Sequence, residues 1–176
     1  MAIQDVILEL NRIRDAGLVL DYAIGGAVAA LAYIETSSTE DVDVFVVLTE
    51  DGTHRLHPLG KIWADLTANG AKEDGGYLVI GGWPVQFLLG SPLDNDGVGS
   101  ARTRMFGDQE GRIMGPEHLA AIAISVGREK DYPRVQEFIK RGKLDMPVFM
   151  GLVEKFGLSE KWKAFETKFL TANERV

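Results

Sequence analysis

The chain contains 176 residues, with 19 Lys and Arg against 26 Asp and Glu and a formal net charge of −7. This acidic balance argues against a protein dedicated to duplex DNA and against a polybasic membrane-surface protein, and the absence of cysteine excludes disulfides, thiolate nucleophiles and iron–sulfur clusters. No apolar run approaches the ~20 residues of a membrane span, and the opening residues MAIQDVILEL carry acid where a signal peptide carries base, so we expect a cytoplasmic protein with no membrane partner.

Hydrophobic periodicity predicts alternating helices and strands over the first part of the chain. Apolar residues three and four positions apart predict an amphipathic helix that ends near Gly17. A pair of glycines, Gly81 and Gly82, separates two apolar runs and predicts a hairpin. The elements expected here, in chain order, are a helix at 3–13, a strand at 18–24, a helix at 27–33, a loop at 34–40, a strand at 41–48, a helix at 54–67, and strands at 77–80 and 83–89.

The rest of the chain is predicted to become helical after a segment at 90–115 rich in Gly and Asp, with short strands near 104–106 and 112–114. The expected helices are 119–126, one from the N-cap residue Asp131 to Gly142, 145–156, and 159–173 with Ser159 as its cap. The order of elements predicts an α/β core with a C-terminal α-helical segment. We expect the core at 1–115 and the helical segment packed on it at 116–176, or one single domain made of both.

Gly25 and Gly26 stand at a predicted junction between a strand and a helix. Glycines allow a tight turn and let a ligand approach the main chain closely. The free N–H groups of a helix start favour an anion such as phosphate. By itself, a Gly-Gly pair before a helix is usually an ordinary turn.

Asp41 and Asp43 lie two positions apart on the apolar strand, so their carboxylates project from the same face. Two like charges side by side are costly unless a cation neutralises them, and Mg²⁺ prefers such hard oxygen ligands. The alternative for an isolated Asp-x-Asp pair is a solvated strand end. The two signals together favour a site.

The combination of Gly25-Gly26, a short helix and Thr39-x-Asp41-Val42-Asp43 on an apolar strand resembles the nucleotidyltransferase superfamily. The similarity is greatest to small bacterial members grouped with AbiEii-type toxins and the minimal nucleotidyltransferases. A later helix also looks like that group's, through Pro116-Glu117-His118-Leu119 and Gly127-Arg128-Glu129-Lys130-Asp131. The resemblance covers about residues 18–140 and implies a mixed sheet flanked by helices.

The resemblance also implies a site and a reaction. Gly25 and Gly26 would cradle the phosphates of a nucleoside triphosphate, Thr39 would belong to the same nucleotide site, and Asp41 and Asp43 would be catalytic residues that hold Mg²⁺ or Mn²⁺. The reaction would be an in-line, two-metal displacement at the α-phosphorus that releases pyrophosphate and transfers a nucleoside monophosphate to a hydroxyl of RNA, protein or a small molecule. The basic residues Arg128 and Lys130 would neutralise phosphate charge.

Three positions depart from the pattern. Gln86 stands where the family often has a third acid, and a neutral amide cannot act as a base. Ser37 replaces an Arg and Ala123 replaces a Lys found in many relatives. A substitute carboxylate could come from any of three residues, namely Asp74, Asp94 and Asp96. The alternatives are therefore a catalytically impaired nucleotide-binding protein, in which Gln86 still lines the site, and an interaction protein paired with an antitoxin or another partner.

Other charged and polar patterns have weaker functional interpretations. His54 and His57 have a spacing compatible with metal ligation but are more simply surface or packing residues, and Arg112 with His118 matches a loose ribonuclease pattern that a Gly-Pro break interrupts. A basic stretch at 128–143 could meet a triphosphate or an RNA end, or it forms a solvated helix face. Its six basic residues are Arg128, Lys130, Arg134, Lys140, Arg141 and Lys143.

Overall fold

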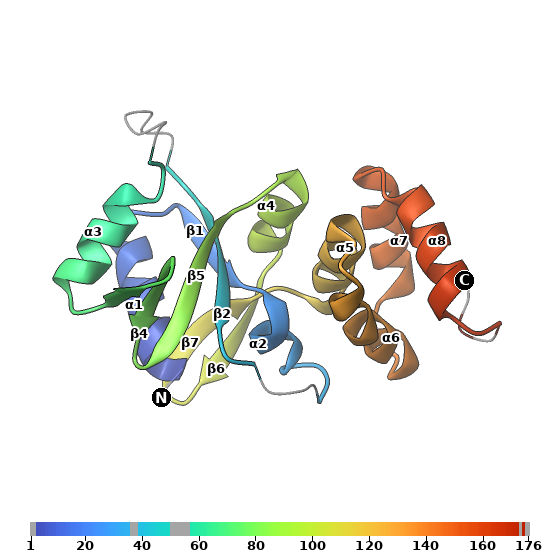
Figure 1. Ribbon diagram of the computed structural model, residues 1–176, viewed down its shortest axis with the longest axis horizontal. Coiled ribbons are helices and arrows are strands. Elements are labelled where there is room, and N and C mark those ends of the chain that lie inside the picture. Colours follow the sequence, from blue (N-terminus) through green and yellow to red (C-terminus); the bar gives the residue numbers. More distant parts are fainter. Residues whose placement is uncertain (1–2, 36–38, 50–56, 173, 175–176) are drawn as a thin grey trace.

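A mixed β-sheet with helices around it forms the centre of the protein (Figure 1). The computed structural model describes residues 3–35, 39–49, 57–172 and 174. Within them, seven strands are ordered β3-β4-β5-β2-β1-β7-β6. The strands are β1 (Asp21–Ile24), β2 (Val42–Val47), β3 (Lys72–Asp74), β4 (Tyr77–Ile80), β5 (Trp83–Leu89), β6 (Arg102–Phe106) and β7 (Gln109–Ile113).

Some helices pack beside the sheet, and the C-terminal helices form a group that extends away from it. Figure 1 shows α1 and α3 beside the sheet, and α2 and α4 between the sheet and a C-terminal group formed by α5–α8. They are α1 (Ile3–Asp15), α2 (Gly26–Ala30), α3 (Gly60–Ala68), α4 (Pro92–Gly99), α5 (Pro116–Val126), the 3₁₀ turn η1 (Glu129–Asp131), α6 (Tyr132–Lys140), α7 (Met146–Lys155) and α8 (Ser159–Phe169). The α/β class and the C-terminal helical segment are confirmed. No helix of the described residues is long and apolar enough to cross a membrane.

Alternation along β2 separates the core face of the sheet from the face that carries the acids. Val42, Val44 and Val46 are buried, whereas Asp43 and Phe45 between them are only half-buried. The strand pairs antiparallel with β1 and parallel with β5, so it lies at the centre of the sheet. A period of two thus places the apolar residues on one face and the carboxylate on the other.

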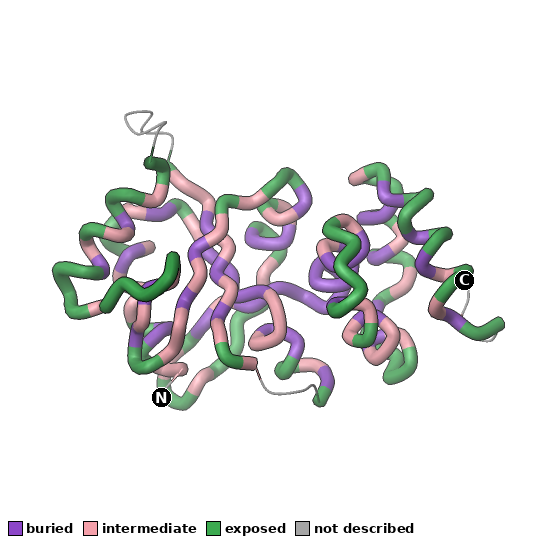
Figure 2. Tube along the Cα trace, viewed as in Figure 1, coloured by how far each residue is buried: buried purple, intermediate pink, exposed green. Residues whose placement is uncertain are grey.

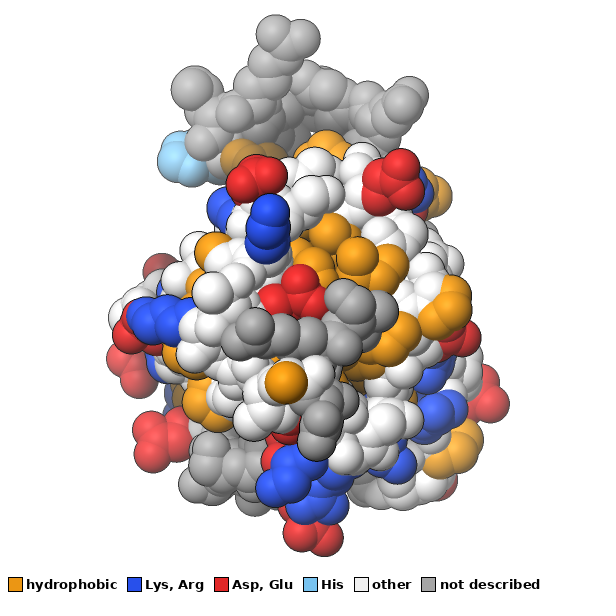
Figure 3. Space-filling model, turned by 90° about the vertical axis from the view of Figure 1, so that its right-hand side faces the viewer, with side chains coloured by type: hydrophobic (Ala, Val, Ile, Leu, Met, Phe, Trp, Pro, Cys, Tyr) orange, Lys and Arg blue, Asp and Glu red, His pale blue; other side chains and the backbone are white. Residues whose placement is uncertain are grey.

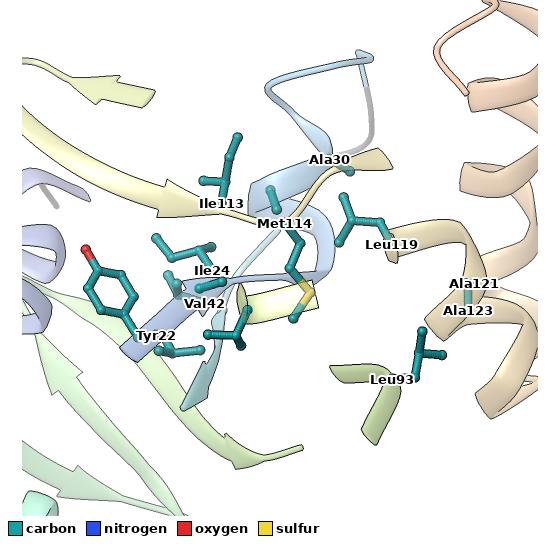
Figure 4. Packing of buried hydrophobic residues seen from close by; sticks show 14 of the residues in the cluster. Tyr22, Ile24, Ala30, Val42, Leu93, Ile113, Met114, Leu119, Ala121 and Ala123 are labelled. Carbon is teal, nitrogen blue, oxygen red and sulfur yellow. The ribbon is translucent and has the colours of Figure 1, made fainter. Parts of the chain in front are cut away.

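The core continues from the sheet into the C-terminal helices. All residues from Ile113 to Ala121 are buried, and Figure 2 shows this purple stretch joining the two parts. In Figure 4 the side chain of Met114 lies between Ile24 of β1 and Leu119 of α5. One apolar cluster therefore spans both parts of the chain.

The face over the C-terminal helices has a mixed surface. Figure 3 shows hydrophobic side chains near its centre, with charged side chains of both signs around them. Beneath it the aromatic rings pack as core, since Phe149 and Phe165 flank Trp162 with centroids 4.8 and 5.5 Å away. The C-terminal helices begin close to where they were expected, except that α5 begins at Pro116 rather than at 119, and α8 has Leu158 rather than Ser159 at its N-cap with no side-chain capping bond.

Three elements in the middle of the chain differ from the prediction, and one of them is the short strand β3, which was not expected. The segment at 90–115 contains helix α4 in addition to its strands. The helix begins with a capping box in which the Ser91 hydroxyl accepts from the Asp94 amide at 3.3 Å and the Asp94 carboxylate accepts from the Ser91 amide at 2.7 Å. The helix expected at 54–67 begins at Gly60, and His54 lies outside the described residues.

Candidate functional site

A cleft of about 1130 Å³ separates the acid-bearing face of the sheet from α5, η1 and α6. Parallel pairing of β2 with β5 places Asp43 directly beside Gln86. Residues from distant parts of the chain line this cleft. Those that the sequence pointed to are Gly26, Thr39, Asp41, Asp43, Gln86, Arg128 and Lys130.

The glycine turn lies directly against Asp43. The Gly25 amide donates to the Asp43 carbonyl at 2.9 Å. Gly26 has φ +56°, and a Cβ built there would stand 2.0 Å from Asp43 Oδ2. Any larger residue would therefore displace the carboxylate. The turn makes room for the Asp43 side chain. Because α2 has only five residues, it is too short to supply the N-terminal dipole of a long helix.

Asp41 is held by a neighbour of its own. The hydroxyl of Thr39 lies 3.0 Å from the Asp41 carbonyl oxygen and 3.2 Å from its Oδ1, so it donates to the residue whose carboxylate enters the cleft. Ser37, the other residue singled out in this loop, lies outside the described residues.

The electrostatic environment of Asp43 suits a bound cation. Burial raises the pKa of the Asp43 carboxyl above its ordinary value, and the negative charge of Asp41 raises it further, while Arg128 and Arg134 oppose both effects. Two carboxylates that repel each other, beside the amide oxygen of Gln86, form a hard-oxygen donor set that fits Mg²⁺ or Mn²⁺. Among the described residues there is no group of three or more acids or histidines arranged for a metal, so the donor set here has only two acids.

The basic stretch is divided by the fold. Arg128, Lys130 and Arg134 line the cleft opposite the acids, together with Asp131, whereas the remaining three basic residues do not line it. Asp131 was expected as the N-cap of a helix and as the last residue of the Gly127–Asp131 motif, and its place on the cleft was not predicted.

The three acids that could replace the missing third carboxylate lie in different parts of the structure. Asp74 and Asp94 line the cleft, and Asp94 also caps α4. Asp96 does not line it, since one of its oxygens contacts His118 at 2.9 Å and the other pairs with Lys155. Asp96 is therefore not the missing acid. The ribonuclease pattern also fails, because Arg112 pairs with Asp21 at 3.0 Å while His118 is bound to Asp96.

One wall of the cleft is apolar and was not foreseen. Leu119, Ile122, Ala123 and Val126 come from successive turns of α5, at the three- and four-residue spacing of a helix face. Ala123, where the resemblance led us to expect a Lys, thus lines the cleft. The sequence predicted a helix at 119–126 here, and most of α5 is buried, with Val126 exposed at its end.

Two solved structures share this architecture. The chain superposes on an antigenic nucleotidyltransferase-like protein from Paracoccidioides brasiliensis with a TM-score of 0.52 and 15% identity, covering 93% of this chain and 94% of the other. The fold is nucleotidyltransferase-like. The antibiotic-resistance factor ANT(2'')-Ia, solved in solution, gives a TM-score of 0.51 at 14% identity over 94% of this chain and 96% of its own. No protein-family model and no curated protein matches the sequence.

These comparisons confirm the predicted superfamily likeness at the level of the fold. The finer likeness to AbiEii-type proteins stays a prediction. Asp41 and Asp43 line the cleft between the sheet and the helices, and their role as a catalytic pair stays a prediction.

Proposed function

We propose that this protein binds a nucleoside triphosphate in the cleft and transfers its nucleoside monophosphate to a hydroxyl acceptor. The observation that supports the proposal best is the pair Asp41 and Asp43 facing Arg128 and Lys130 across one cleft. Carboxylates on one wall and cations on the other match the two needs of a metal-bound polyphosphate. The nucleotidyltransferase-like fold supports the same conclusion.

Each group has a distinct part in this proposal. Asp41, oriented by Thr39, and Asp43, backed by the Gly26 turn, would hold Mg²⁺ or Mn²⁺. Such an ion, when bound, neutralises charge on phosphate oxygens. Arg128 and Lys130 would bind the phosphates that leave as pyrophosphate. The acceptor oxygen would form its bond to the α-phosphorus as the bond to the bridging oxygen breaks.

Calorimetric titration of each NTP, with and without Mg²⁺, tests the nucleotide site. We expect metal-dependent binding by the wild type and a loss of at least about tenfold in affinity for Asp41→Ala, equivalent to about 1.4 kcal/mol. Glu40→Ala is the matched control, because Glu40 is adjacent, lines the same cleft and is exposed. NTP binding by Asp41→Ala with unchanged metal dependence would show that the site is wrong.

A second candidate function, nucleotide binding without transfer, is favoured by Gln86. Its amide lies beside Asp43 where a third carboxylate would complete the site, and an amide cannot accept the proton of an attacking hydroxyl near neutral pH.

Gln86→Asp separates the two candidates. If the missing acid is the only defect, transfer of labelled nucleotide should rise in the variant, by about 10²-fold or more for a gained general base. Gln86→Glu is the control for the position of the carboxylate, because the Glu side chain is longer than that of Asp. Robust transfer by the wild type that Gln86→Asp leaves unchanged would instead show that the proton is accepted elsewhere.

A further inference from the structure

Asp131 is a buried carboxylate whose position in the helix does not explain it. It is 8% exposed and stands at the N-cap of α6, where an Asp side chain ordinarily accepts from a first-turn amide. No such bond forms, and its φ of −91° and ψ of −17° are helical rather than extended. The carboxylate is therefore directed away from the helix end.

The two oxygens of Asp131 face two different arginines. Oδ2 accepts from Arg128 Nε at 2.9 Å, and Oδ1 lies 3.8 Å from Arg134 Nη1. The Asp131 side chain is 11% exposed, whereas the side chains of Arg128 and Arg134 are 61% and 22% exposed. One buried anion thus lies beneath two guanidinium groups that remain open to the cleft.

These guanidinium groups also face Asp43 of β2. Both lower the pKa of the Asp43 carboxyl, and all three side chains line the same cleft. A pair of cations opposite a pair of carboxylates leaves a space whose two sides suit a polyphosphate and its counterion. An ion pair with one largely exposed partner contributes little net stability on average, so stability alone does not account for the arrangement.

We propose that Asp131 is a positioning residue that holds Arg128 and Arg134 side by side as the binding site for the terminal phosphates of a nucleoside triphosphate. This inference rests on the proposed function, because it identifies the part of the same cleft that binds the polyphosphate. Asp131 itself touches no phosphate in this arrangement and acts through the two arginines.

The direction in which one substitution changes the affinity for an anion tests the inference. Asp131→Asn removes a negative charge close to an anion site, which by electrostatics alone should strengthen anion binding. If Asp131 positions the arginines, the same change should weaken binding by about tenfold, because the two guanidinium groups lose their common anchor. Asp131→Glu, which retains the charge, should recover part of the loss.

The probe is inorganic tripolyphosphate, titrated calorimetrically in the presence of EDTA so that the metal ligands do not contribute. Glu129→Gln is the matched control: it removes one negative charge from the residue next to Arg128, and because the Glu129 carboxylate pairs with Lys168 at 2.7 Å rather than with the arginines, binding should be unchanged or tighter. A double-mutant cycle supplies the second measurement, since Asp131→Asn should have no further effect in an Arg128→Gln/Arg134→Gln background. Should Asp131→Asn not fold, Asp131→Glu is carried through the same cycle.

Each outcome decides the inference. Weaker binding by Asp131→Asn, abolished in the double-arginine background, supports it. Equal or tighter binding by a folded Asp131→Asn overturns it and leaves the proposed function intact, as does a wild type that binds Mg²⁺–NTP but not tripolyphosphate. A wild type that binds neither overturns the inference and the proposed function together.

Discussion

At the scale of single residues, Asp43 is the carboxyl whose ionised form the site disfavours. It is half-buried, lies against Gly26 and has Asp41 on the same strand face, while Arg128 and Arg134 only partly compensate for the resulting rise in its pKa. A carboxyl whose pKa is raised by folding is protonated more easily in the folded state than in the unfolded state. Its ionisation therefore destabilises the fold as pH rises through the folded-state pKa.

Asp43→Asn should consequently stabilise the protein without ligand at neutral pH. Both states of the wild type bind the proton below the unfolded pKa of about 3.9, so the difference should vanish there and develop as pH rises. A gain on the order of 1 kcal/mol would raise the Tm by about 2–4 °C at pH 7 for a chain of this size. Thermal unfolding followed by circular dichroism between pH 3 and 8 measures it, a range that extends below and above the unfolded pKa of about 3.9.

Asp108→Asn is the control for a general charge effect, because Asp108 is exposed in the turn between β6 and β7. The Asp108→Asn substitution should change the Tm only slightly across the same pH range. If Asp43→Asn has a lower Tm than the wild type at pH 7, or a higher Tm by the same amount at every pH, ionisation of Asp43 does not destabilise the fold.

Most residues of the candidate site could be named from the sequence, because local patterns expose them. A period of two places Asp41 and Asp43 on one face, and the glycine pair precedes a helix as its turn requires. The pairing of Asp131 with Arg128 and Arg134, opposite Asp43, could not be predicted, since it depends on how α6 lies relative to β2. Such an arrangement is set by tertiary packing and leaves no periodic signal along the chain.

At the scale of elements, the missed strand and helix had recognisable signals. Gly75 and Gly76 have φ +55° and +88°, which matches the turn at Gly81 and Gly82 that correctly predicted a hairpin. The same reasoning would have predicted β3. Ser91-Pro92-Leu93-Asp94 contains the cap, the first-turn proline and the reciprocal acid of a capping box, and so could have predicted α4. The high glycine content of the segment obscured that signal.

The packing of α5 is different, because no local rule could have shown it. Glu117 is buried at the first turn, where it binds Arg102 of β6 at 2.9 Å and accepts from the Asp145 amide at the start of α7 at 3.1 Å. His118 binds Asp96 of α4. Two polar side chains in the first turn of α5 thus contact the sheet, α4 and the start of α7, while apolar residues of its later turns form one wall of the cleft.

At the scale of the whole molecule, the division into a core at 1–115 and a helical segment at 116–176 stays a prediction. The contacts of α5 and the buried run from Ile113 to Ala121 cross that boundary. The cleft is also built from both sides of it, since the acids come from the sheet and the cations from η1 and α6. The proposed function therefore requires the sheet and the C-terminal helices to keep a fixed position relative to each other.

Unfolding tests whether they form one cooperative unit, and the tryptophans suit the purpose. Trp63 and Trp83 lie in α3 and β5, whereas Trp162 lies in α8. We expect Trp162→Phe and the double variant Trp63→Phe/Trp83→Phe each to show fluorescence and circular dichroism midpoints that coincide in urea, because the shared core leaves neither part a separate apolar interior. Comparing two probes within each variant removes the effect of the substitution on stability. Separate midpoints, with Trp162 reporting its own transition, would establish two domains and place the cleft at a boundary free to open.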